Sequence, residues 1–265
     1  MARLTGCAVV AVRRSGSVSE ATLDGGDVVV VKHGHGSAEA AGLRWLAEPG
    51  VVRVPAVRGH DEDWLVLDRV GTGQPSVGAA ERLGRGLAEL HSAGAPAFGS
   101  PPPGAPTEAW IGLAPMTNTT GDDWPSWYAE HRVLPYVRQA VDNGSLDVGE
   151  AAVFERACAR IPDVTESPAR LHGDLWNGNV LWDPQDAWLI DPAAHGGHRE
   201  TDLAMLHLFG CPHLDRVLGA YQEVAPLAHD WRERIGLHQL FPLLVHTVLF
   251  GRGYAAQAVA AATSW

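Results

Sequence analysis

The residue types that phosphoryl transfer needs occur together in one segment, between His172 and Asp191. The segment contains the run LHGDLWNGN, and Asp191 follows its last asparagine by twelve residues, directly after the apolar pair Leu189-Ile190. Carboxylate and amide oxygens are ligands that Mg²⁺ accepts, and a carboxylate can take the proton of an attacking hydroxyl. The segment is therefore predicted to hold an ATP-dependent phosphoryl-transfer centre.

The spacing assigns roles to three residues of this segment. An aspartate followed five positions later by an asparagine is typical of the catalytic loop of kinases. Asp174 is therefore predicted to be the base, and Asn179 and Asp191 the Mg²⁺ ligands. A lone D-x-x-x-x-N pattern is common in solvated turns, but here His172-Gly173 precedes it and two apolar strands flank it. These additions favour the catalytic interpretation.

Lysine occurs once among the 20 basic residues, at Lys32, which ends the run Val28–Val31. An ammonium is a compact point charge and a guanidinium is a broad fork, so this position is interpreted as one that needs an ammonium. Lys32 is predicted to bind the phosphates of ATP, and Glu39, at the start of the next helix, to pair with it. The connection of only seven residues between them is short for that pairing.

A glycine-containing loop, Ser15-Gly16-Ser17, lies before the second expected strand. Its backbone N–H groups are candidate donors to ATP phosphates. A plain hairpin turn is the alternative, because the loop lacks a full G-x-G-x-x-G pattern.

The charge and composition of the chain exclude several classes of partner. The formal net charge is −11, and the longest basic run is Arg13-Arg14, which suits neither nucleic acid nor an anionic membrane. The three cysteines lack the C-x-x-C spacing of a metal or redox site. No uncharged apolar run reaches the roughly 18 residues of a membrane span. We expect a cytoplasmic protein, and the sequence leaves its oligomeric state open.

Hydrophobic patterning divides the chain into a strand-rich part and a helical part. The first part is expected to contain strands at 7–12, 28–32, 52–57 and 64–70 and a helix at 38–47. The second part is expected to contain a loop at 96–106, strands at 180–182 and 188–190, and helices from Ser76 to about Gly94, from Asp122 or Asp123 through Tyr136, at 149–161 and from Thr201 onward. The prediction is an α+β, two-lobed fold. Residues 1–72 would form a small antiparallel-sheet lobe that binds the nucleotide, and residues 73–265 a mostly helical catalytic and substrate lobe.

The run HGDLWNGN and the later run IDPAAHGGHRETDLAMLHLFG resemble the fructosamine kinase (ketosamine-3-kinase) family, whose HGD loop is shared with aminoglycoside and choline kinases. Other parts resemble the same family, namely SGSVSEATLDGGDVVVVK, EAAGLRWLAEPGVVRVPAV and IGLAPMTNTTGDDWPSWYAEHRVLPYVRQA. The likeness therefore covers nearly the whole chain.

The resemblance implies a protein-kinase-like fold and phosphorylation by ATP and Mg²⁺ of the sugar 3-hydroxyl of ketosamines. The ketosamine would be fructosamine or ribulosamine, free or attached to protein amines, so that the activity would repair glycated amines. Asp68 stands where the family usually has a hinge glutamate and is expected to lie near the nucleotide. Trp176 is expected to face the sugar, and further substrate contacts are expected from His198, Arg199 and Glu200.

Two other interpretations stay open at this point. One is an aminoglycoside or choline-type phosphotransferase, and the other is a catalytically silent, nucleotide-binding pseudokinase that regulates a partner. A zinc site at His195, His198 and His207 is not favoured, because no glutamate lies at helical spacing between the first pair.

Overall fold

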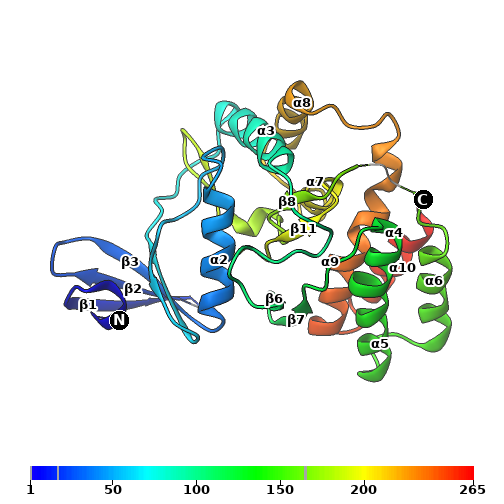
Figure 1. Ribbon diagram of the computed structural model, residues 1–265, viewed down its shortest axis with the longest axis horizontal. Coiled ribbons are helices and arrows are strands. Elements are labelled where there is room, and N and C mark those ends of the chain that lie inside the picture. Colours follow the sequence, from blue (N-terminus) through cyan, green and yellow to red (C-terminus); the bar gives the residue numbers. More distant parts are fainter. Residues whose placement is uncertain (1, 17, 164–165) are drawn as a thin grey trace.

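The computed structural model describes residues 2–16, 18–163 and 166–265. A small lobe built on one sheet precedes a larger lobe that is mostly helical, and Figure 1 shows helix α2 standing between the two. Within the described ranges, no helix combines the length and apolar character that crossing a membrane requires. The architecture is the two-lobed α+β fold that the sequence predicts.

The N-terminal lobe is a five-stranded antiparallel sheet with the strand order β1-β2-β3-β5-β4. Its strands are β1 (Val9–Ser15), β2 (Val18–Leu23), β3 (Val28–His33), β4 (Val57–His60) and β5 (Trp64–Asp68). The short helix α1 (Ala2–Thr5) precedes the sheet, and α2 (Gly36–Ala47) packs against one of its faces.

Alternation along β3 decides which way Lys32 points. Val29 and Val31 are buried with Val66 on the outer face of the sheet. Because side chains alternate along a strand, Lys32 lies on the opposite face, directly across from Leu65 of β5. Leu65 packs against α2, so Lys32 faces the side of the sheet that carries α2.

The strand expected at 52–57 is wrong for all but its last residue, since β4 begins at Val57. Pro55 has no N–H group to give to a ladder. Arg53 instead forms a parallel bridge with Trp188 of the other lobe, and its carbonyl accepts the N–H of Leu189 at 2.8 Å. This segment therefore ties the lobes together.

Helices form most of the C-terminal lobe. They are α3 (Val77–Ser92), α4 (Trp124–Tyr128), α5 (Leu134–Asp142), α6 (Val148–Cys158), α7 (Glu200–Leu206), α8 (Leu214–Val224), α9 (Ile235–Phe250) and α10 (Ala255–Thr263), with π or 3₁₀ turns η1 (Ala129–Val133), η2 (Asn177–Asn179) and η3 (Trp231–Arg234). The side chain of Ser76 accepts the N–H of Ala79 at 3.1 Å and caps α3, while that of Asp123 accepts the N–H of Ser126 and caps α4. Both helix starts agree with the sequence prediction.

Three short antiparallel strand pairs complete this lobe. They are β6 (Glu108–Ile111) with β7 (Ala114–Thr117), β8 (Ala169–Leu171) with β11 (His195–Gly197), and β9 (Val180–Trp182) with β10 (Ala187–Leu189). Sequence patterning finds only the last pair. The β6–β7 hairpin has one local signal, Gly112 in the left-handed region at φ 56°, whereas three-residue strands such as β8 and β11 are too short to show a period.

Candidate active site

The predicted catalytic loop connects β8 to the turn η2. Gly173, beside the expected base, has φ 82°, and a Cβ at this position would lie 2.1 Å from the carbonyl oxygen of Ala193. Only glycine fits both the backbone angle and the space. The loop is therefore pressed against the segment that follows Asp191.

Asp202, at the start of α7, anchors the backbone of this loop by hydrogen bonds. Its two carboxylate oxygens accept the N–H groups of His172 at 2.7 Å and Gly173 at 2.9 Å, and Nε2 of His91 lies 3.2 Å away. Asp202 is fully buried. Burial raises its pKa, but the contacts with His91, His172 and Gly173 outweigh burial and hold the pKa below its ordinary value. Sequence reasoning missed this residue, although an aspartate inside the apolar run of α7 is a signal for a buried acceptor.

Asp174 and Asn179 form a pair inside the loop. The side-chain amide of Asn179 donates to the backbone oxygen of Asp174 at 2.8 Å and to its Oδ2 at 2.9 Å. Burial raises the pKa of Asp174 to about 7, against the opposing effect of the Asn179 hydrogen bond. A carboxyl group with a pKa near neutrality suits proton transfer at physiological pH.

Lys32 pairs with one carboxylate from each lobe, Glu39 of α2 in its own lobe and Asp191 in the helical lobe. Its Nζ lies 2.6 and 2.7 Å from the two oxygens of Glu39 and 2.8 Å from Oδ1 of Asp191. The short connection to Glu39 is possible because Gly34 and His35 both have positive φ, 105° and 50°, and turn the chain directly into α2. Burial lowers the pKa of Lys32, but the two carboxylates outweigh it and raise the pKa above its ordinary value. Lys32 is therefore a fixed cation.

Asp191 takes an unusual backbone conformation, with φ 54°. A non-glycine residue in this region costs on the order of 1–3 kcal/mol, and such residues cluster at functional sites. Its side chain is 45% exposed, which leaves carboxylate surface open to the cleft beside Lys32.

Replacing Lys32 by arginine is expected to lower kcat/KM by about 10² although the charge is kept, because a planar guanidinium cannot place one nitrogen at the point where Glu39 and Asp191 meet. Steady-state assays of ADP release measure the effect. Arg13→Lys, an exchange at an exposed position of β1, is the matched control and should be silent. A Lys32→Arg variant within twofold of wild type would contradict the inference from the single lysine.

A cavity of about 420 Å³ lies between the lobes. The residues predicted for chemistry line it together: Lys32, Glu39, Asp174, Asn179 and Asp191. Trp176 also lines it. His35 and Trp110 of β6 lie on its wall, stacked across the cleft with ring centroids 3.4 Å apart and planes 14° from parallel.

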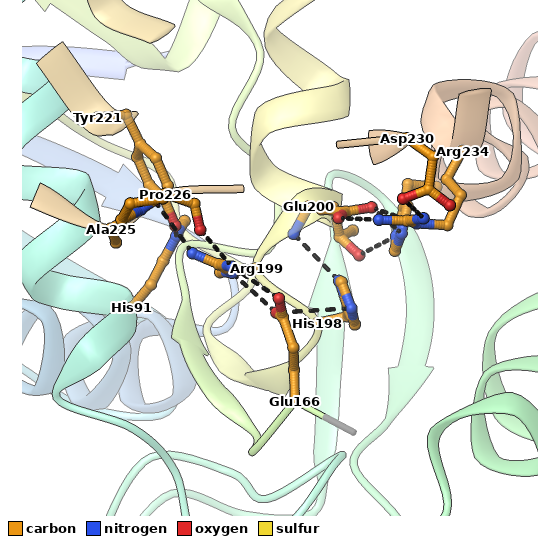
Figure 2. Close-up of polar contacts among 12 residues, drawn as sticks. His91, Glu166, His198, Arg199, Glu200, Tyr221, Ala225, Pro226, Asp230 and Arg234 are labelled. Atoms are coloured by element: carbon orange, nitrogen blue, oxygen red, sulfur yellow. Dashed lines mark hydrogen bonds and ion pairs between the residues drawn. The ribbon is translucent and has the colours of Figure 1, made fainter. Parts of the chain in front are cut away.

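His198, Arg199 and Glu200 are not among the residues that line this cavity. Figure 2 shows them held by partners inside the protein. Arg199 donates to both carboxylate oxygens of Glu166 and to the carbonyls of Ala225 and Pro226.

Glu200 forms a second internal ion pair, with Arg234 at 2.6 and 2.9 Å. Burial raises the pKa of Glu200, but His238 and Arg234 outweigh burial and lower it to about 2. His198 is buried against Trp124 and His238. Three of the four residues predicted to contact substrate are thus held by partners inside the protein, and the positions of His198, Arg199 and Glu200 do not favour the predicted contact.

Two further predicted nucleotide contacts lie apart from the cavity. The side chain of Asp68 lies on the outer side of the sheet, across from Val29, and pairs with Arg58. Gly16 is exposed at the β1–β2 turn with φ 60°, Ser15 ends β1, and Ser17 lies outside the described residues. A phosphate contact from this turn stays a prediction.

Comparison with known proteins by sequence gives one family and several relatives. The family described as fructosamine kinase matches residues 34–264. A "probable ketoamine kinase" of Thermus thermophilus is 35% identical over 219 residues, which cover 82% of this chain and 77% of the relative. The chloroplastic protein-ribulosamine 3-kinase of Arabidopsis thaliana is 31% identical over 234 residues, which cover 83% and 69%.

Solved structures give the same relationship. The crystal structure of a "putative fructosamine-3-kinase" from Thermobifida fusca has a TM-score of 0.91 and 47% identity, covering 99% of this chain and 96% of that one. A macrolide 2′-phosphotransferase from Brachybacterium faecium has a TM-score of 0.57 and 16% identity, covering 99% and 94%. The second likeness concerns the fold alone.

Proposed function

Since the chain belongs to the fructosamine kinase family, we propose that it phosphorylates the sugar 3-hydroxyl of ketosamines with ATP. Relatives are named as kinases of ketoamines and of protein ribulosamines. The observation that carries the proposal is the convergence of Lys32, Asp174 and Asp191 on one cavity between the lobes. An intact catalytic set disfavours the pseudokinase alternative, and the names of the relatives favour ketosamines over aminoglycosides or choline.

Asp174 acts as the base in this proposal. As the 3-oxygen of the sugar attacks the γ-phosphorus, its O–H bond breaks and the proton passes to the Asp174 carboxylate. The new O–P bond forms while the bond between the γ-phosphorus and the bridging oxygen breaks, and ADP leaves with the electron pair. The hydrogen bond from Asn179 to Oδ2 fixes the carboxylate so that its other oxygen can face the hydroxyl.

Asn179 and Asp191 fit a divalent cation such as Mg²⁺. Both offer oxygen atoms, the donor type that Mg²⁺ prefers. Because Nδ2 of Asn179 is occupied by two bonds to Asp174, its Oδ1 is directed elsewhere and is available as a ligand. A bound cation would neutralise phosphate charge, and Lys32 would add a second positive charge from the N-terminal lobe.

Trp176 is proposed to contact the sugar. It follows the base by two residues, lines the cavity and is only partly buried. Sugars present C–H faces that stack on indole rings.

Ketosamines on small amines and on protein amines are both proposed as substrates. A cytoplasmic setting is also proposed, and the three free cysteines are consistent with it. We also propose that the nucleotide lobe ends at residue 72.

A substrate panel tests the proposed function. ADP release is expected with fructosyl-lysine and ribulosyl-lysine in the presence of ATP and Mg²⁺, and not with kanamycin, gentamicin or choline. The phosphorylated product, analysed by NMR, should carry phosphate on the 3-oxygen. Turnover of an aminoglycoside without turnover of any ketosamine would contradict the proposal.

A further inference from the structure

Five aromatic side chains form a continuous rim beside the catalytic loop, called here the aromatic rim. Its members are Trp176, Phe209, His246, Phe250 and Tyr254. Ring centroids are 5.7 Å apart for Trp176 and Phe209, 5.1 Å for Phe209 and His246, and 5.5 Å for His246 and Phe250. The rim therefore runs outward from the tryptophan proposed to contact the sugar.

The outer part of the rim is open to solvent. Phe250 is 63% exposed and Phe209 is 38% exposed. Leu113, at the tip of the β6–β7 hairpin, is 82% exposed and lines the same cavity as Phe250. Exposed apolar side chains that gather at the mouth of a catalytic cavity mark a surface for binding apolar groups.

The charges along the cavity favour a cation over an anion as the acceptor substrate. Among the described residues that line it, Glu39, Asp174 and Asp191 carry carboxylates and Lys32 alone carries a permanent positive charge. Lys32 is already paired with two of those carboxylates. The secondary amine of a ketosamine is protonated near neutral pH, and aromatic faces attract cations.

We propose that the aromatic rim binds the amine side of the ketosamine, meaning its ammonium group and the alkyl chain attached to it. This inference rests on the proposed function. With the sugar held between Asp174 and Trp176, the amine substituent has to leave the cavity, and the rim extends outward from Trp176. Ketosamines with long alkyl substituents, such as the four methylenes of a lysine side chain, are then preferred over those with short ones.

Three substrates separate the contribution of the alkyl chain to kcat/KM from that of the ammonium group. Fructosyl-methylamine and fructosyl-hexylamine carry the same charge and differ only in methylenes, and 1-O-hexyl-fructose replaces the ammonium of the second by an ether oxygen. Each buried methylene is worth about fourfold. We expect kcat/KM for fructosyl-hexylamine to exceed that for fructosyl-methylamine by at least about tenfold, and that for the ether by about fivefold.

Substitution at the rim tests its part in this preference. Phe250→Ala is expected to lower the hexyl-to-methyl ratio of kcat/KM about fivefold. Because Phe250 is largely exposed at the end of α9, its removal should leave the melting temperature near that of wild type. Val148→Ala, at a 78% exposed position of α6 outside the cavity, is the control and should leave the ratio unchanged.

The outcomes distinguish failure of the aromatic rim as a binding surface from failure of the proposed ketosamine kinase activity. Equal use of the methyl and hexyl substrates, or a ratio unaffected by Phe250→Ala, would overturn the rim as a binding surface while ketosamine turnover stands. Equal use of the amine and the ether would overturn the role of the ammonium. No turnover of either amine substrate, nor of fructosyl-lysine or ribulosyl-lysine, would overturn the proposed function itself.

Discussion

Asp174→Asn is expected to lower kcat by about 10³-fold, because removal of a general base typically costs between 10² and 10⁴. The amide keeps the shape of the side chain and can still pair with Asn179, but it cannot accept the proton of the hydroxyl. The affinity for ATP should stay within about twofold, since Lys32 and Asp191 are intact. Single-turnover assays and nucleotide titrations measure the two quantities.

The same substitution should stabilise the protein at alkaline pH. Burial raises the pKa of Asp174 from 3.8 to about 7, so between these values the folded state holds a proton that the unfolded state has lost. The stability this proton gives is present below about pH 4 and is lost as pH rises through about 7. Three pKa units correspond to about 4 kcal/mol. Asparagine stays neutral and avoids this loss.

Thermal melts of Asp174→Asn and wild type should therefore differ little at pH 4 and by several degrees at pH 8, with the variant the more stable. Asp122→Asn, at an exposed aspartate away from the cavity, controls for loss of one negative charge. A gap in melting temperature that narrows as pH rises would contradict the shifted pKa. Retention of more than a tenth of the wild-type kcat would contradict the assigned base.

Asp202→Ala should destabilise the fold by about 3–5 kcal/mol, which is the usual result when one partner is removed from a buried charged network. The substitution leaves the N–H groups of His172 and Gly173 without their acceptor and removes the carboxylate beside His91. For a chain of this size the melting temperature should fall by roughly 10 °C. Differential scanning calorimetry measures the change.

A matched substitution separates the buried role of Asp202 from an ordinary helix-end effect. Asp215 also lies in the first turn of a helix, α8, but is exposed, so Asp215→Ala should change the melting temperature by no more than about 2 °C. Assays well below both melting temperatures should also show a lower kcat for Asp202→Ala, because the loop that carries Asp174 loses its anchor. A melting temperature for Asp202→Ala within 2 °C of wild type would contradict the anchoring role.

Local spacing was enough to predict the chemistry, because the loop that carries Asp174 and Asn179 is short. Over so few residues, the spacing alone keeps the side chains of Asp174 and Asn179 within reach of each other. The valine strand likewise indicated Lys32, since alternation determines the face of a strand. The pairing with Glu39 was harder to predict, because it depends on positive φ angles at Gly34 and His35, and the second of these is not a glycine.

Sequence alone could not distinguish ligand contacts from internal ion pairs at Arg199 and Glu200. Both uses require the same charged residue types, and the partners, Glu166 and Arg234, lie more than 30 positions away in the chain. The partners of Asp202 are distant in the same way, since His91, His172 and Gly173 lie 29 or more positions away in the chain. Long-range packing decides these roles.

Contacts that join the two lobes include those of Lys32 with Asp191, His35 with Trp110, and Arg53 with Leu189. Each contact joins a residue of the sheet lobe, or of the segments next to it, to the helical lobe. Folding therefore fixes much of the angle between the two lobes. A loosely hinged enzyme loses conformational entropy when its lobes close on the substrates. Here that entropy is already lost on folding, so the cleft is preorganised for binding.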